Sequence, residues 1–369
     1  MALEKTITEK ITKSPMVLCL KRRRFFRFAF KPVFFLYLLC IAAAYLSFGC
    51  SGNQTYSLQT IRGQTMGTTF MVKVVKDTPA LPYNTFESEI NTLLVEVNRQ
   101  MSTYIEDSEI SQFNRYRGVD WFAVSPDFAM VLQQSLDIAE QSGGALDITI
   151  GPLIYLWGFG TRQQDNIIPP DSEIEQAQKR CGYQHLAVQH SPPSVKKEIP
   201  EMYCDLSAIA KGFGVDKIAE YLASQGAKNF MVEIGGEVRT LGKNASGQPW
   251  RIGIETPNSS GAIQNVIVLE NIAVATSGDY RNYFEKDGVR YSHTIDPRTG
   301  KPITHTLASV TVFHESCSMA DGLATAINVL GPDAGYELAI KYNLAVFMLV
   351  KTENGFRELR TSAAEKFFP

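Results

Sequence analysis

Few residues in this chain can hold zinc or form cross-links. Only six cysteines and five histidines occur among the 369 residues. No Cys-x-x-Cys pair and no Cys/His spacing indicates a zinc site, and an odd number of cysteines in a large folded region argues against a disulfide framework. We expect Cys181, Cys204 and Cys317 to be buried thiols.

Positive charge is scarce over most of the chain. Residues 1–50 hold nine Lys/Arg and two Asp/Glu, so residues 51–369 hold 27 and 36, a formal net charge of −9. Binding to nucleic acid needs clustered cations that replace the counterions of the phosphate backbone. We therefore expect no nucleic-acid partner, although a single dinucleotide needs only local compensation of its charge.

The chain also lacks internal repeats and low-complexity segments. Its composition, with 44% hydrophobic and 20% charged residues, provides material for a large core. We predict a signal peptide or leader over residues 1–49, a tether over 50–60 and one folded domain over 61–369.

The leader contains an apolar run that is short for a membrane span. The run, at 33–48, has about 16 residues and follows a Lys/Arg cluster at 21–31, whereas a spanning helix needs roughly 20. This order, ending in small residues and Gly49, is typical of an export signal that is cleaved before Cys50. A cysteine at this place resembles that of a bacterial lipoprotein, although Ser47 stands where such signals usually have leucine.

Two forms of membrane attachment follow from this leader. We expect lipidation of Cys50, which makes membrane lipid a partner, and an uncleaved signal anchor is the alternative. Met16 as the true start would shorten the region before the basic cluster. Either form predicts a bacterial cell-envelope protein whose domain faces away from the cytoplasm.

Apolar periodicity predicts an α+β fold. Alternating apolar residues predict strands, and apolar residues every three or four positions predict helices. The expected helices cover 86–101, 125–141, 171–180 and 205–222, and the expected strands cover 67–75, 229–234, 250–254, 266–269, 272–276, 308–312 and 345–350. Runs of strands with a few helices favour α+β over a regular α/β alternation.

Glycine marks two places where close approach is expected. The stretch 144–160 is too rich in glycine and turns to be one regular element, and we interpret it as a binding loop. Gly212 and Gly214 fall in an expected helix, where each costs about 1 kcal/mol relative to alanine. They indicate the approach of another backbone or a ligand, with plain helix packing as the alternative.

Asp321 and Thr325 form a candidate magnesium edge. They are four residues apart, so a helix would place both oxygens on one face near its start. Magnesium takes oxygen ligands and uses one or two carboxylates, completing its shell with carbonyls, water and phosphate. An N-terminal aspartate and a packed threonine are the alternative.

A second candidate cluster lies beside an expected turn. His293, Asp296 and Arg298 place an acid–base group, a carboxylate and a phosphate-binding guanidinium within six residues. We expect a loop that displays them, although a structural role for the histidine stays open. Upstream, 276–279 ends a strand with hydroxyls and glycine, whose amides suit phosphate oxygens.

Ten short motifs follow one another between Met66 and Gly331. They are Met66-Gly-Thr, Met101-Ser-Thr-Tyr104, Gly144-Ala-Leu-Asp147, Gly151-Pro-Leu, Leu156-Trp-Gly-Phe-Gly, Asp205-Leu-Ser-Ala-Ile-Ala-Lys211-Gly, Glu233-Ile-Gly-Gly-Glu237, Thr276-Ser-Gly-Asp-Tyr, Ser292-His-Thr-Ile-Asp-Pro and Ala320-Asp-Gly-Leu-Ala-Thr325. In this order they resemble the ApbE family of FAD:protein FMN transferases, whose architecture is T-fold-like. The departures are confined to the leader.

The resemblance implies a set of binding residues. Those implied to contact FAD are Met66, Tyr104, Ala145, Leu146, Asp147, Asp205, Lys211 and Ile295; those implied to hold Mg²⁺ are Asp321, Thr325 and the carbonyl of Ala208. These residue types suit the ligands, since aromatic and thioether groups cover flat rings, and lysine and metal neutralise a pyrophosphate. The alternatives are core packing for Met66 and Tyr104, a surface cation for Lys211, and caps or turns for the two FAD-site aspartates.

The implied reaction transfers FMN from FAD to a Thr or Ser hydroxyl of a target protein and releases AMP. Positioning and charge neutralisation carry most of such phosphoryl transfers. His293 is our first candidate for accepting the hydroxyl proton, with Asp279 and Asp296 behind it. The implied partners are exported or membrane flavoprotein subunits of quinone reductases and related electron-transport complexes.

Two other functions would use the same residues. Water in place of the acceptor hydroxyl would make the protein an FAD pyrophosphatase that yields FMN and AMP. A lipoprotein that only binds FAD would show no magnesium-dependent turnover, and the Asp321/Thr325 pair argues against it.

Overall fold

The computed structural model describes residues 56–160, 168–257, 262–278, 283–286 and 288–369. The expected leader, Cys50 and Asp279 lie outside these residues. All described residues belong to one unit of the chain, Asn53–Pro369. Within the described ranges, no helix is both long enough and apolar enough to cross a bilayer.

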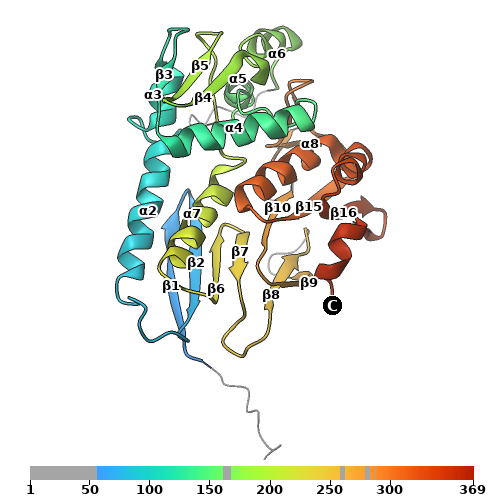
Figure 1. The fold of residues 1–369 in the computed structure, drawn as a ribbon. Coiled ribbons are helices and arrows are strands. Elements are labelled where there is room, and N and C mark those ends of the chain that lie inside the picture. Colours follow the sequence, from blue (N-terminus) through green and yellow to red (C-terminus); the bar gives the residue numbers. More distant parts are fainter. Residues whose placement is uncertain (1–55, 161–167, 258–261, 279–282, 287) are drawn as a thin grey trace, which may run out of the picture. The chain divides into compact units, whose positions relative to one another are not determined.

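An eight-stranded antiparallel sheet forms the centre of this unit. Its spatial order is β1-β2-β6-β7-β10-β15-β16-β17 (Figure 1). The strands are β1 (Leu58–Thr65), β2 (Thr68–Val75), β6 (Phe230–Ile234), β7 (Glu237–Leu241), β10 (Ala273–Gly278), β15 (Leu307–His314), β16 (Ala345–Thr352) and β17 (Gly355–Arg360).

Smaller sheets and helices surround this sheet. The other strands are β3 (Phe122–Ala123), β4 (Leu186–His190), β5 (Pro193–Lys197), β8 (Trp250–Glu255), β9 (Ile263–Leu269), β11 (Tyr283–Lys286), β12 (Val289–Ser292), β13 (Ile295–Asp296) and β14 (Lys301–Pro302). The helices are α2 (Phe86–Met101), α3 (Glu109–Arg115), α4 (Pro126–Gln141), α5 (Gly151–Leu156), α6 (Asp171–Gln178), α7 (Ala210–Ser224) and α8 (Cys317–Lys341), with 3-10 turns η1 (Tyr183–His185) and η2 (Ser362–Phe367).

The central sheet is buried on both faces because its strands alternate two apolar sets. In β16, Val346 and Met348 pack beneath the helices, whereas Phe347 and Leu349 pack with the β8–β9 hairpin and η2. Successive side chains of a strand point to opposite faces, so one strand supplies both cores. Helix α7 covers β6 and β7, and α8 covers β10 and β15 beside it (Figure 1).

Most predicted elements are confirmed, and the fold is α+β as expected. Helix α2 has the predicted bounds, and Ser125 caps α4 by accepting from Phe128 N. Three predictions are wrong in part. The helix expected over 205–222 begins only at Ala210, because the side chain of Asp205 accepts from Ser207 N and forms a turn there. Strand β1 begins at Leu58, inside the expected tether 50–60, because it pairs along its whole length with β2. The expected loop at 144–160 contains α5, where a proline in the first turn favours helix entry.

The three cysteines of the folded domain are free thiols. Cys204 and Cys317 are fully buried, and Cys181 is half-buried. Burial raises the pKa of the Cys204 thiol to about 12. The expectation of buried thiols is confirmed for Cys204 and Cys317, whereas Cys181 is only half-buried.

Asn114 of α3 fixes the segment that leads to Asp205. Its amide donates to Cys204 O at 2.9 Å and accepts from Cys204 N at 2.7 Å, and its side chain is buried. We expect Asn114→Ala to lower the free energy of unfolding by about 2–3 kcal/mol, because two buried backbone groups lose their partner. Urea unfolding measures this change.

The matched control is Asn91→Ala in α2, where an exposed amide donates to Glu87 O. We expect it to change the free energy of unfolding by no more than about 0.5 kcal/mol. Equal losses in the two variants would contradict the role of Asn114.

Candidate active site

Helices α7 and α8 cross where each begins. A Cβ atom at Gly212 would lie 2.3 Å from the carbonyl oxygen of Cys317, so a side chain there is incompatible with this approach. A Cβ atom at Gly214 would lie 2.9 Å from Met66 Cε and 3.2 Å from Ile234 Cδ1. The expected approach of another backbone is therefore confirmed at Gly212, whereas the alternative, packing of side chains against the helix, holds at Gly214.

A buried charge cluster lies at this crossing. The Lys211 ammonium is 3.4 Å from Asp321 Oδ2 and 3.4 Å from Glu237 Oε1. Gly212 N donates to Asp321 Oδ2 at 3.0 Å. The carboxyl groups are nearly inaccessible, since Asp321 is 5% and Glu237 3% exposed. Lys211 is therefore the partner of two buried carboxylates and not an isolated surface cation.

Burial and mutual interaction shift all three pKa values. Burial raises the pKa of Glu237 to about 8, against the opposing effect of Lys211 and with a further increase from Asp321. Burial also raises the pKa of Asp321. Burial alone would lower the pKa of Lys211, but the two carboxylates raise it above its ordinary value. When all three groups are ionised, the cluster has one negative charge in excess.

Glu237 is a member of this cluster to which the sequence analysis assigned no role. Glu237 is the last residue of the family motif Glu233-Ile-Gly-Gly-Glu237, and this membership was the one feature of the sequence that could have pointed to it. Its Oε2 is buried and has no hydrogen-bond partner among the described residues. The two ends of the motif lie in different places. Glu233, Gly235 and Gly236 line a cavity of about 310 Å³ next to the β8–β9 hairpin. Glu237 instead forms an ion pair with Lys211.

The expected magnesium ligands lie along the two crossing helices. Asp321 is in α8, Thr325 follows one turn later, and Ala208 directly precedes Ile209, the N-cap of α7. In the described part of the chain, no group of three His, Cys, Asp or Glu residues could hold a metal. The expected set is of another kind, with one carboxylate, one hydroxyl and one carbonyl, and it stays a prediction.

Met66 occupies the turn between β1 and β2 with φ of 50°, followed by Gly67 with φ of 72°. Few residues other than glycine, asparagine and aspartate adopt this left-handed conformation, which costs roughly 1–3 kcal/mol. The half-buried Met66 side chain packs against α7 near Gly214. A two-residue hairpin turn of this kind needs positive φ at both central residues, and Met66 packs against two core clusters, so its contact with FAD stays a prediction.

The segment 145–147 and Asp205 meet side by side. Asp205 N donates to Ile148 O at 2.7 Å. Ala145 and Leu146 are buried, and Leu146 reaches α8, where a Cβ at Gly322 would lie 3.6 Å from its Cδ2. The segment 145–148 therefore lies next to both Asp205 and the first turns of α8.

The two FAD-site aspartates both stabilise turns. Asp147 Oδ1 accepts from Thr149 N and Oγ1, and its Oδ2 accepts from Tyr183 N. Burial raises the pKa of Asp147, and these hydrogen bonds oppose the shift. Asp205 Oδ1 accepts from Ser207 N at 2.8 Å. The turn role is confirmed for both, and their contact with FAD stays a prediction.

Tyr104 is not a core residue. Its side chain is 77% exposed, in the turn after α2. Partial desolvation and the negative charge of Asp205 raise the pKa of Tyr104. An open aromatic ring at this position suits a flat ligand.

An aromatic cluster joins the stretch 144–160 to the loop that contains His293. Trp157 stacks on Tyr291 with ring centroids 5.9 Å apart, and Phe159 meets His293 edge-on at 6.5 Å. Trp157 Nε1 also donates to Gly300 O at 2.8 Å. Ile295 is buried in this cluster, and its strand, β13, lies against α8. Residues 144–160 thus support the loop that contains His293 and Asp296.

Asp296 orders its own turn. Both of its oxygens accept from Arg298, at 2.9 and 2.8 Å, and its carbonyl accepts from Gly300 N at 2.8 Å. The Arg298 guanidinium is therefore engaged by Asp296. The roles of Asp296 and His293 in proton transfer stay predictions, and Asp279 lies outside the described residues.

Comparison with known proteins agrees with this geometry. Residues 66–348 match the model of the ApbE family, and the chain belongs to this family. FAD:protein FMN transferases from Vibrio cholerae and Haemophilus influenzae are each 45% identical, over 90% and 83% of this chain and 98% and 90% of their own lengths. The expected family and class of enzyme, a flavinyltransferase, are confirmed.

Solved structures give the same result. The flavin transferase ApbE from V. cholerae superposes with a TM-score of 0.79 at 45% identity, covering 85% of this chain and all of that one. The apo flavinyl transferase ApbE from Pseudomonas stutzeri superposes with a TM-score of 0.79 at 36% identity, covering 85% and 98%.

The raised pKa of Glu237 predicts how stability depends on pH. Between its ordinary value of 4.5 and about 8, the folded protein keeps a proton that the unfolded chain releases. The free energy of unfolding should therefore fall as pH rises through this window, by at most about 1.4 kcal/mol per pH unit. Glu237→Gln should flatten this slope, as measured by urea unfolding at pH 5, 6.5 and 8. Equal slopes for the two proteins would contradict the assignment.

Proposed function

We propose that this chain is an FAD:protein FMN transferase that uses Mg²⁺ and a Thr or Ser acceptor. The observation that carries the proposal is the Lys211–Asp321–Glu237 cluster at the crossing of α7 and α8, in a chain of the ApbE family. Relatives named as FAD:protein FMN transferases align with most of the chain, which supports FMN transfer over simple flavin binding.

The residues present fit a magnesium ion. Asp321 is buried beside the Lys211 ammonium, and Glu237 Oε2 is buried without a partner among the residues described. Asp321, Thr325 and the Ala208 carbonyl offer only hard oxygen donors, which Mg²⁺ prefers. A bound ion would neutralise charge on the pyrophosphate and on the departing phosphate.

The chain's own residues would orient FAD and accept a proton. Lys211 provides fixed positive charge for the pyrophosphate, and Met66 and Tyr104 offer surfaces for flat rings. The acceptor oxygen forms a bond to the phosphorus on the FMN side, the phosphorus–oxygen bond to AMP breaks, and AMP leaves with the electron pair. We assign the hydroxyl proton to His293, beside Phe159, with Asp279 and Asp296 as supporting carboxylates.

We infer that the targets are exported or membrane flavoprotein subunits of electron-transport complexes. This follows from the proposed envelope location, in which the T-fold-like domain hangs from a lipidated Cys50 and faces away from the cytoplasm. The acidic balance of residues 51–369 supports the absence of a nucleic-acid partner.

Intact-protein mass spectrometry of a threonine-bearing acceptor subunit tests the transferase. After incubation with the protein, FAD and Mg²⁺, we expect the acceptor to gain one FMN while AMP is released. Free FMN without a gain in mass would identify an FAD pyrophosphatase instead. The absence of both products would indicate a protein that only binds flavin.

Asp321→Ala tests the metal assignment. We expect the variant to fold and FMN transfer to fall by more than about 100-fold, because charge in the transition state loses its main stabiliser. The matched control is Asp333→Ala, an exposed carboxylate farther along α8, which should keep wild-type activity. Retained magnesium-dependent transfer by Asp321→Ala would refute the assignment.

Cys50→Ser tests the proposed lipid anchor. We expect the variant to move from the membrane to the soluble fraction on cell fractionation, because a serine offers no thiol for lipidation. Cys181→Ser, which changes a half-buried thiol of the folded domain, should stay with the membrane. If Cys50→Ser also stays there, the apolar run at 33–48 is an uncleaved anchor.

A further inference from the structure

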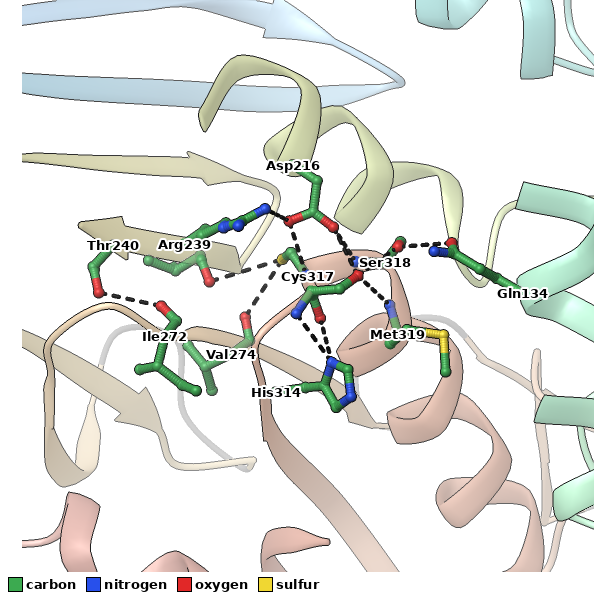
Figure 2. Close-up of polar contacts among 12 residues, drawn as sticks. Gln134, Asp216, Arg239, Thr240, Ile272, Val274, His314, Cys317, Ser318 and Met319 are labelled. Atoms are coloured by element: carbon green, nitrogen blue, oxygen red, sulfur yellow. Dashed lines mark hydrogen bonds and ion pairs between the residues drawn. The ribbon is translucent and has the colours of Figure 1, made fainter. Parts of the chain in front are cut away.

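A carboxylate of α7, Asp216, lies at the start of α8 (Figure 2). Its Oδ1 accepts from Cys317 N at 2.9 Å, and its Oδ2 accepts from Ser318 N at 3.0 Å. The Ser316 hydroxyl donates to Oδ2 at 2.9 Å, and Arg239 donates to Oδ1 at 2.6 Å. With 5% exposure, Asp216 spends both oxygens on the first turn of one helix and on one arginine.

These contacts complete the N-terminus of α8. The first N–H groups of a helix have no partner within the helix and point toward negative charge. Ser316 accepts from Met319 N and so satisfies one of them, whereas Asp216 satisfies those of Cys317 and Ser318. The first turn of α8 is therefore capped in part from another helix, and it precedes Asp321 directly.

Helix α7 thus holds α8 at two points. Near the start of α7, Gly212 N donates to Asp321 Oδ2 at 3.0 Å. Asp216 follows four residues later, which is a rise of about 6 Å along the helix axis. Two attachments separated along one rigid helix fix both the rotation and the translation of the first turn of α8.

Strand β7 supports both attachments, because two of its residues form ion pairs with α7. Glu237 pairs with Lys211, and Arg239, two residues later, pairs with Asp216. Residues i and i+2 of a strand lie on the same face, whereas Val238 between them packs in the opposite core. Lys211 and Asp216 therefore both form ion pairs with the same strand, β7. Through its contacts with α7, Asp321 takes its position from these two residues.

We propose that Asp216 is a positioning residue for Asp321 in the transfer reaction. By bridging Arg239 and the first turn of α8, it holds the Asp321 carboxylate at a fixed place beside Lys211. This proposal rests on the proposed function, because Asp321 is taken there as the magnesium-binding carboxylate.

Asp216→Asn is the informative variant. The asparagine keeps the shape of the side chain, but its amide nitrogen cannot accept from the backbone N–H groups of α8. Groups that orient a metal ligand typically change metal affinity by about 10- to 100-fold when they are lost. We expect the Mg²⁺ concentration for half-maximal FMN transfer to rise by about this factor. The KM for FAD should change by less than about threefold, since Met66 and Tyr104 are untouched.

Two further variants frame this result. Arg239→Lys retains the charge and the backbone bonds of Asp216 but loses the fixed guanidinium geometry, so we expect a smaller shift in the same direction. Asp127→Asn removes the ion pair of α4 with Lys217, which lies next to Asp216 in α7 and does not involve α8. We expect this control to have wild-type magnesium dependence.

Calorimetric titration of Mg²⁺ into each protein with FAD present provides a readout that is independent of turnover. All titrations should be run well below the lowest unfolding midpoint of the set, determined by circular dichroism. Weaker Mg²⁺ binding by Asp216→Asn and Arg239→Lys, with unchanged binding by Asp127→Asn, would support the proposal. If Asp216→Asn does not fold, Arg239→Lys decides.

Two outcomes would overturn the proposal. A lower unfolding midpoint with wild-type Mg²⁺ affinity and turnover would give Asp216 a purely stabilising role. Absence of Mg²⁺ binding by the wild-type protein would also reject it, together with the metal assignment. If wild type binds Mg²⁺ and FAD but transfers no FMN, only the proposed function fails, and calorimetry still decides the role of Asp216.

Discussion

The close crossing of α7 and α8 at Gly212 is the constraint on which the site depends. Because no Cβ separates the helices, the backbone N–H of Gly212 reaches Asp321 and the adjacent Lys211 lies between two buried carboxylates. A larger residue at 212 would separate the helices and admit water to these charges. Water would screen the interactions that give the cluster its shifted pKa values.

The central sheet supplies the second half of this arrangement. Strand β7 sends Glu237 and Arg239 toward the helices and Val238 into the core on the other face. A polar strand face is ordinarily a solvent face, but here α7 covers it with Lys211 and Asp216, so the charges are paired when they are buried. The same strand therefore contributes to the hydrophobic core and to the candidate active site.

Local sequence patterns predicted the regular elements well where one face is apolar. The periodicity of α2 and the cap at Ser125 needed no tertiary information, and all seven strands predicted from the sequence lie within a few residues of those observed. Of the central sheet, strands β1, β7 and β17 were not predicted. Their sequences alternate only weakly between polar and apolar residues, or have the polar residues typical of exposed segments. Pairing with neighbouring strands is what makes these segments extended.

The sequence by itself determined the fold class, the family and the residues of the ten motifs, because these depend on residue type and order along the chain. Only the tertiary structure decided which motifs meet. It joined Lys211 to Asp321, which are distant in sequence, and added Glu237 and Asp216, whose partners lie on other elements. The approach of two backbones at a glycine and the burial of a charge are properties of packed elements, and no local pattern encodes them.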